Sequence, residues 1–328
     1  MKTIFFKNSP KIISTSNVAG PKECQGCLAN YFDKKLDNDK FGQDTFEQAE
    51  SKMLYTAVKN SIMKASLNEN QIDAMISGDL LNQIIASTFA ARNFDFAYLG
   101  LYNACATFTE ALTLGATLID GGYLSNVVCA TSSHFSTAER QYRYPLELGC
   151  TRPPQSQWTV TGAGACVLSA NGVGPKITQA TIGRIIDYGV VDANNMGSAM
   201  APATCDTLLR HFKQTNSEPS DYDLIVSGDL GTLGSRILKD LIWEKGYDIE
   251  KQHVDCGELL FNLSENEYQG GSGAGCSALV FSSYLYNKLY NKQLKRILLV
   301  ASGALLSSVS TQQGDSIPGI AHAVVVEN

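Results

Sequence analysis

The sequence lacks any long hydrophobic run and carries little positive charge. It contains no uninterrupted apolar run of about 18 residues that would span a bilayer. Its opening residues, MKTIFFKNSPKIISTS, contain no apolar stretch long enough for a signal peptide. Lysine and arginine total 26 against 32 acidic residues, giving a net charge of −6 and no basic run, which argues against nucleic acid as the principal partner. We therefore expect a soluble protein made in the cytoplasm, in which any anionic ligand needs locally concentrated positive charge.

Histidine is scarce, and cysteine is present in an odd number. The nine cysteines lie mostly in apolar strand-like or helical runs, which is typical of reduced core thiols in a reducing compartment. A CxxC pair at residues 24–27 has no second CxxC or HxxxH to complete a zinc site, so we expect a surface loop and no metal. Of the four histidines, we expect His322 in the core and His211 and His253 at the surface. His134 ends a predicted strand and is a candidate pocket residue.

The stretch 99–134 predicts a strand, a sharp turn that carries Cys105, a buried helix and a second strand. The helix is apolar on almost all sides, with only Glu110 and Asp120 charged, so we expect it inside the protein. Two glycines end it, and residues 127–130 predict a buried strand of a mostly parallel sheet. Cys105 then lies at the helix N-terminus, where unpaired amides and the helix dipole favour a thiolate or another anion.

The second half of the chain repeats the first half. The segment DAMISGDL at 73–80 returns as DLIVSGDL at 223–230. The helix that begins near Cys105 returns in the same order as a largely apolar helix that begins near Cys276, and each is followed by a buried strand. Several matches in one order indicate an internal duplication of a βα unit.

Two duplicated βα halves predict an α/β fold with five layers, α-β-α-β-α, in which the two central helices pack between the sheets. We expect an N-terminal half at 1–172, which includes an irregular segment at 135–161, and a C-terminal half at 173–328. Asp79 and Asp229 each follow a Ser-Gly pair at the end of a predicted strand. We expect each of these aspartates to cap the helix that follows it.

Longer motifs resemble those of a known family. They are AGPK at 19–22, GDLLNQ at 78–83, ATSSH at 130–134, TAERQYRYP at 137–145, DANNMGSAMAP at 192–202 and GALLS at 303–307. The duplicated half with its cysteine resembles the thiolase fold shared by thiolases and ketoacyl synthases, and the motifs together resemble the stage V sporulation protein AD family over essentially the whole chain.

This resemblance implies a role in sporulation and germination. It implies a homodimer that binds dipicolinic acid (pyridine-2,6-dicarboxylate) and works with the integral membrane subunits of a SpoVA-type complex, which moves this compound across the inner spore membrane. The lack of a signal and the reduced cysteines favour the cytoplasmic, spore-core face of that membrane.

A condensing enzyme of the thiolase fold needs catalytic partners from its second half. Initiating ketoacyl synthases place a histidine where this chain has Gly228, and thiolases place one in the loop that matches 269–273 and a second cysteine near 301–302. Because these partners are absent, we expect Cys105 to have no general base from the second half, and the protein to be neither an enzyme nor dependent on a cofactor. Two alternatives stay open: an acyl-transfer or condensing enzyme that uses Cys105, and a structural plug or scaffold without a ligand.

The resemblance places dipicolinate above the N-terminus of the Cys105 helix. One carboxylate would face the backbone amides of 104–107, and the other would meet Arg140 or Arg143, because a planar dianion favours guanidinium groups and an aromatic slot. The predicted ligand-binding residues are Ala104, Cys105, Thr107, His134, Arg140, Tyr142 and Arg143.

Overall fold

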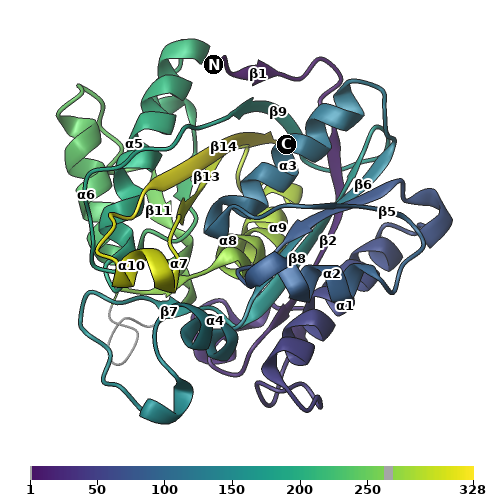
Figure 1. The fold of residues 1–328 in the computed structure, drawn as a ribbon. Helices are drawn as coiled ribbons and strands as arrows, with labels where there is room; N and C mark the ends of the chain where they lie inside the picture. Colours follow the sequence, from purple (N-terminus) through teal and green to yellow (C-terminus); the bar gives the residue numbers. More distant parts are fainter. Residues whose placement is uncertain (1, 262–268) are drawn as a thin grey trace.

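A twelve-stranded mixed sheet forms the frame of the protein in a computed structural model that describes residues 2–261 and 269–328 (Figure 1). Its main path runs through β11 (His253–Asp255), β10 (Leu224–Ser227), β13 (Arg296–Ala304), β14 (Gly319–Glu327), β9 (Lys176–Thr181), β2 (Lys11–Ala19), β8 (Gly162–Ser169), β6 (Asn126–Ser133), β4 (Ala74–Gly78) and β5 (Ala97–Gly100). β9 and β2 pair at one position only, Lys11 with Lys176. The path therefore consists of two five-stranded halves joined at a narrow seam.

The two half-sheets have the same internal order. β4 pairs in parallel with β5 and β6, and β8 is antiparallel to both β6 and β2. In the second half, β10 pairs in parallel with β11 and β13, and β14 is antiparallel to both β13 and β9. This equivalence confirms the duplication. The expectation of a mostly parallel sheet around 127–130 was wrong, because β6 has one parallel and one antiparallel neighbour.

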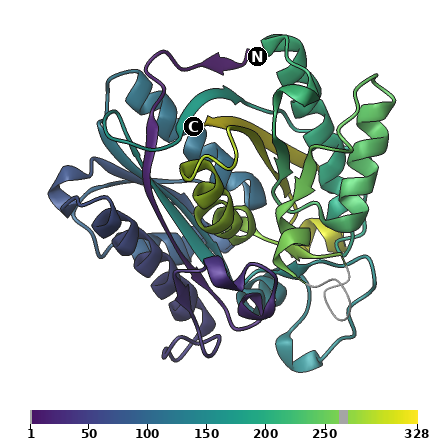
Figure 2. The same ribbon diagram turned by 180° about the vertical axis from the view of Figure 1, so that it is seen from behind.

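Helices cover both faces of each half-sheet. The outer layers are α1 (Phe46–Lys64) and α2 (Ile85–Ala91) on the first half, and α5 (Met196–Thr215) and α6 (Gly231–Trp243) on the second. The middle layer consists of α3 (Thr107–Asp120), α8 (Ala274–Val280) and α9 (Tyr286–Tyr290). α3 contacts β4 and β6 of one half and β13 and β14 of the other. Figure 2 shows α8 and α9, in olive, between the blue and green outer layers. The five-layered fold is therefore confirmed.

The remaining elements are short and lie around this frame. They are α4 (Phe135–Tyr142), α7 (Cys256–Leu260), α10 (Ser308–Gln312), β1 (Ile4–Phe5), β3 (Lys34–Lys35), β7 (Trp158–Thr159) and β12 (Gly271–Ser272). The predicted division after residue 172 falls in the connection between β8 and β9, and it stays a prediction. Among the helices of the described ranges, none has both the length and the apolar character needed to cross a membrane.

α3 packs closely on the first half-sheet because of its sequence. The side chains of Phe108 and Leu112 in α3 are fully buried. A side chain at Gly115 would begin 2.8 Å from the Cys129 sulfur and 3.0 Å from the Leu168 side chain. The helix can therefore lie against β6 and β8 only because residue 115 is glycine.

The expectation that Asp79 caps the following helix was wrong. α2 begins only at Ile85, after a turn in which Gln83 adopts a left-handed backbone conformation. The buried Asp79 carboxylate accepts hydrogen bonds from the amides of Leu81, at 2.8 Å, and Ser87, at 2.7 Å. Asp79 therefore links the end of β4 to the first turn of α2. Its buried carboxylate needs hydrogen-bond donors, and the amides of Leu81 and Ser87 supply them.

Candidate anion-binding site

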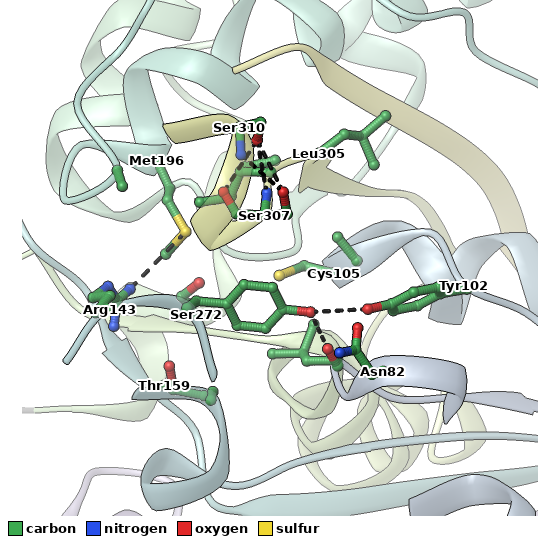
Figure 3. Close-up of a pocket in the computed structure, with 17 residues that line it drawn as sticks. Asn82, Tyr102, Cys105, Arg143, Thr159, Met196, Ser272, Leu305, Ser307 and Ser310 are labelled. Atoms are coloured by element: carbon green, nitrogen blue, oxygen red, sulfur yellow. Dashed lines mark hydrogen bonds between the residues drawn. The ribbon is translucent and has the colours of Figure 1, made fainter. Parts of the chain in front are cut away.

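A cavity of about 420 Å³ lies at the start of α3, between the two halves of the chain (Figure 3). Its first-half lining consists of Leu80, Asn82, Tyr102, Ala104, Cys105, Ala138, Tyr142, Arg143 and Thr159. Its second-half lining consists of Ala193, Met196, Ser272, Ala304, Leu305, Leu306, Ser307 and Ser310. Leu80 follows β4 and Ala304 ends β13, so the cavity lies at the carboxyl ends of two central strands, where α/β proteins commonly bind ligands.

Cys105 lies on the floor of this cavity. It belongs to a 3-10 turn, Ala104–Ala106, that leads directly into α3, and Ala104 has a left-handed backbone with φ of 49°. The side chain is 6% exposed. Burial, followed by the nearby Asp229 carboxyl, raises the pKa of the Cys105 thiol well above its ordinary value. The expectation that the helix N-terminus favours a thiolate was therefore wrong, because desolvation and a neighbouring acid outweigh the helix dipole.

Asp229 does not have the helix-capping role that its position in the sequence predicts. Its Oδ2 accepts hydrogen bonds from Ser272 Oγ at 3.3 Å and from the Gly273 amide at 3.2 Å, while Asp255 accepts from the amides at the start of α6. Asp229 is therefore not a helix cap. It interacts with the Cys105 thiol, and burial raises the pKa of Asp229 to about 7. The expectation that the second half offers Cys105 no candidate general base overlooked Asp229, a carboxyl that follows Gly228 in the chain and interacts with the Cys105 thiol.

His134 does not line the cavity, contrary to expectation. Its ring is buried and packs on Phe46 of α1 with the ring centroids 5.1 Å apart. Nδ1 accepts a hydrogen bond from the Ser136 amide at 3.1 Å, so Nε2 carries the proton and donates to the Asp39 carbonyl at 2.9 Å. The ring faces α1 because it caps the start of α4.

The other histidines also lie outside the cavity lining. His211 and His253 are buried rather than at the surface, since Tyr222 OH lies 2.7 Å from His211 and Ser227 Oγ lies 2.9 Å from His253. His322 is buried in β14, as expected. Burial lowers the pKa of His211 and His322 to about 4 and that of His253 to about 3. At neutral pH all three rings are uncharged.

The two predicted arginines have different environments. Arg143 follows the last residue of α4 with non-helical backbone angles, which turn its side chain toward the cavity. Its side chain is 8% exposed, and Nη1 donates to Glu139, which also accepts from Arg152 at 2.9 Å. Within the described part of the chain, Nη2 contacts only a weak acceptor, the Met196 sulfur at 4.0 Å. Arg140 is half-exposed, pairs with Glu47 of α1 and does not line the cavity.

Tyr142 and Thr107 also have different positions. Tyr142 lines the cavity and donates its hydroxyl to the Leu80 carbonyl, and this hydroxyl lies 3.2 Å from the Tyr102 hydroxyl. Thr107 is buried and outside the lining, because its hydroxyl donates to the Ala104 carbonyl at 2.7 Å and closes the turn before α3. Of the seven predicted residues, the structure brings Ala104, Cys105, Tyr142 and Arg143 together.

A family model for "Stage V sporulation protein AD (SpoVAD)" matches residues 1–327. The chain belongs to this family. A curated SpoVAD relative, Stage V sporulation protein AD of Bacillus subtilis (strain 168), is 42% identical over 326 residues, which cover 99% of this chain and 96% of the relative. The family relationship supports a role in sporulation.

Solved structures with the same fold include enzymes. One is 3-oxoacyl-[acyl-carrier-protein] synthase III from Aquifex aeolicus VF5, with a TM-score of 0.59 and 14% identity over 97% of this chain and 100% of that chain. Another is Xanthomonas campestris OleA with bound lauric acid and lauroyl-CoA, with a TM-score of 0.63 and 13% identity over 98% of this chain and 99% of that one. At such identities the likeness establishes the thiolase-like fold of this SpoVAD family member and nothing about its chemistry.

Proposed function

We propose that this protein binds dipicolinic acid in the Cys105 cavity and takes part in its uptake into the developing spore and its release at germination, without catalysing a reaction. The observation that carries the proposal is the Arg143 guanidinium at the cavity wall, where the Met196 sulfur is the one hydrogen-bond acceptor near Nη2 among the described residues. A carboxylate there would receive a charge-assisted hydrogen bond from a donor that is already held in place by Glu139.

The rest of the cavity suits a planar aromatic dianion. Leu80, Ala138 and Tyr142 supply apolar and aromatic walls. A second carboxylate would face the start of the turn before α3, where the amides of Ala106 and Thr107 already donate to the carbonyls of Asn103 and Ala104 and leave the preceding amides for the ligand. A helix N-terminus contributes about 0.3–1 kcal/mol to binding an anion and up to about 2 kcal/mol when partly buried. Together with a charge-assisted hydrogen bond of about 1.5–3 kcal/mol, these contacts support binding in the micromolar range.

The proposal that the protein is not an enzyme is supported by the state of Cys105. A thiol whose pKa is raised by burial and by Asp229 is a poor nucleophile at neutral pH. The pairing of Cys105 with Asp229 is the one feature that favours the alternative, an acyl-transfer enzyme, because a carboxyl beside a thiol could accept its proton. Turnover of acyl-CoA thioesters through an acylated Cys105 would establish that alternative.

Titration of the purified protein with dipicolinate by calorimetry tests the binding function. We expect saturable binding at one site per chain with a micromolar Kd. Benzoate, which has one carboxylate, is the matched control and should bind more weakly because it can satisfy only one of the two anion contacts. Absence of dipicolinate binding would favour the remaining alternative, a structural plug or scaffold.

We further propose that the protein acts as the peripheral subunit of a SpoVA-type complex on the core face of the inner spore membrane, bound to integral membrane subunits. This assembly is what the resemblance to the stage V sporulation protein AD family implies. The cavity would then receive dipicolinate from, or deliver it to, the membrane subunits.

The protein is also proposed to form a homodimer through β5. In the described ranges β5 pairs only with β4, and its Leu99 side chain is 44% exposed, so its outer edge is available to a second copy of the strand.

We expect a dimer by light scattering at micromolar concentration. Leu99→Lys should shift it toward monomer, because two like charges would meet across the two-fold axis. Tyr123→Lys, at a residue 78% exposed outside β5, is the control, and a wild-type monomer would contradict the proposal.

A further inference from the structure

Asp229 is a buried acid beside the cavity. Binding of a ligand in the cavity does not by itself require this acid. The residue is 1% exposed. Its Oδ2 has two hydrogen-bond donors, but Oδ1 has none within hydrogen-bond distance among the described residues. Burial of an ionised carboxylate costs free energy, and two donors to Oδ2 offset only part of that cost. A protonated carboxyl carries no charge and needs fewer donors.

Among the residues that the structure describes, the titratable groups that face Asp229 do not offer a positive charge. They are Cys105 from the turn before α3, Asp255 and Cys256 at the start of α7, and Cys276 of α8. Burial raises the pKa of each of these thiols, so they are neutral near pH 7. Asp255 keeps several donors, including Ser227 Oγ at 2.6 Å, and therefore ionises more readily than Asp229. Its charge adds to the cost of ionising Asp229.

An anion bound above Cys105 would add to the same repulsion. Cys105 lines the cavity and also interacts with Asp229, which lies outside the lining. A carboxylate of the ligand and an ionised Asp229 would then be separated by about one side chain in a site with little water to screen them. Protonation of Asp229 removes this repulsion without moving any residue.

We propose that the site takes up its dianionic ligand together with one proton, which Asp229 holds beneath Cys105. This inference rests on the proposed binding of dipicolinate. Carboxylates are ionised at neutral pH, so the proton comes from the solvent and not from the ligand. Burial together with the Asp255 charge raises the pKa of Asp229 to about 7, so the free protein is poised to accept a proton in the physiological range.

Calorimetry in two buffers with different ionisation enthalpies, HEPES and Tris at about pH 7.5, measures this proton directly. For the wild-type protein we expect a buffer-dependent heat that corresponds to uptake of up to about one proton per dipicolinate. Affinity should then fall by up to about tenfold per pH unit above the pKa of Asp229, because ionised Asp229 must first be protonated. Equal binding heats in the two buffers would overturn the proposal without any variant.

Two variants locate the proton. Asp229→Asn keeps the shape and an acceptor for the Gly273 amide, and it should bind dipicolinate without proton uptake and more tightly than wild type at about pH 8.5. Glu23→Gln is the matched control: Glu23 is also buried, burial raises its pKa to about 8, and it lies outside the cavity lining. It should retain the wild-type proton uptake. Uptake that persists in Asp229→Asn would contradict the assignment, whereas lack of any dipicolinate binding would remove the proposed function itself.

Discussion

Arg143→Ala is expected to weaken dipicolinate binding by about 10- to 150-fold, which corresponds to loss of one charge-assisted hydrogen bond worth about 1.5–3 kcal/mol. Arg143 is the only charged side chain in the cavity lining as described, and its Nη2 has no stronger contact than the Met196 sulfur. Glu139 keeps its ion pair with Arg152 in the variant, so the local structure should persist. The residual binding should also depend less on salt concentration. Calorimetric titration measures each of these quantities.

Arg140→Ala is the matched control for this prediction. Arg140 lies three residues earlier, carries the same charge and forms an ion pair at the surface with Glu47. Removing it changes the net charge of the protein by the same amount but leaves the cavity wall intact, so we expect less than about a threefold change in Kd, as is typical of an exposed pair. Equal losses in both variants would indicate a nonspecific effect of net charge, and wild-type affinity in Arg143→Ala would remove Arg143 from the site.

Much of the fold could be predicted from the sequence because burial and repetition leave strong local signals. The apolar helix after Cys105 had to be buried, and the structure places α3 between the half-sheets. The recurrence of 73–80 at 223–230 became the equivalent strands β4 and β10. The direction of neighbouring strands leaves no such signal in the sequence. β6 is buried along almost its whole length, and parallel and antiparallel neighbours would bury the same apolar residues.

The cavity was harder to predict because side-chain direction at the ends of elements depends on tertiary contacts. His134 and Arg143 both lie near the ends of elements that approach the cavity, yet His134 turns toward Phe46 and Arg143 turns inward. The α4 helix ends between Arg140 and Arg143, and this separates two arginines that the sequence treats alike. The ionisation state of the Cys105 thiol was harder still to predict. Its pKa depends on burial and on Asp229, which lies 124 positions later in the chain.

The electrostatics of the site follow from these positions. Cys105 belongs to the cavity lining and interacts with the buried acid Asp229, which interacts with Asp255, and both acids lie outside the lining. Arg143 supplies the single guanidinium of the lining as described. A dianion is therefore drawn to one side of the cavity and repelled by the other unless a proton is taken up. The binding energy and its pH dependence should consequently be separable, with Arg143 controlling the first and Asp229 the second.

Phe108→Ala is expected to lower the free energy of unfolding by about 3–5 kcal/mol, the usual cost of removing a fully buried phenylalanine. Phe108 is fully buried in α3 and packs on Phe281, at the C-terminal end of α8, with the ring centroids 5.7 Å apart. This contact joins the two central helices, and therefore the two halves of the chain. Because the surrounding strands are held in register by their ladders, the cavity left behind cannot fully collapse.

Leu114→Ala is the control on the same helix. Leu114 is 37% exposed, so its truncation removes less buried surface and should cost less than about 1 kcal/mol. Urea denaturation followed by circular dichroism, at one fixed protein concentration and without ligand so that neither dimerisation nor binding shifts the midpoint, measures both values. Equal costs for the two substitutions would mean that the middle layer is not where the two halves of the fold are held together.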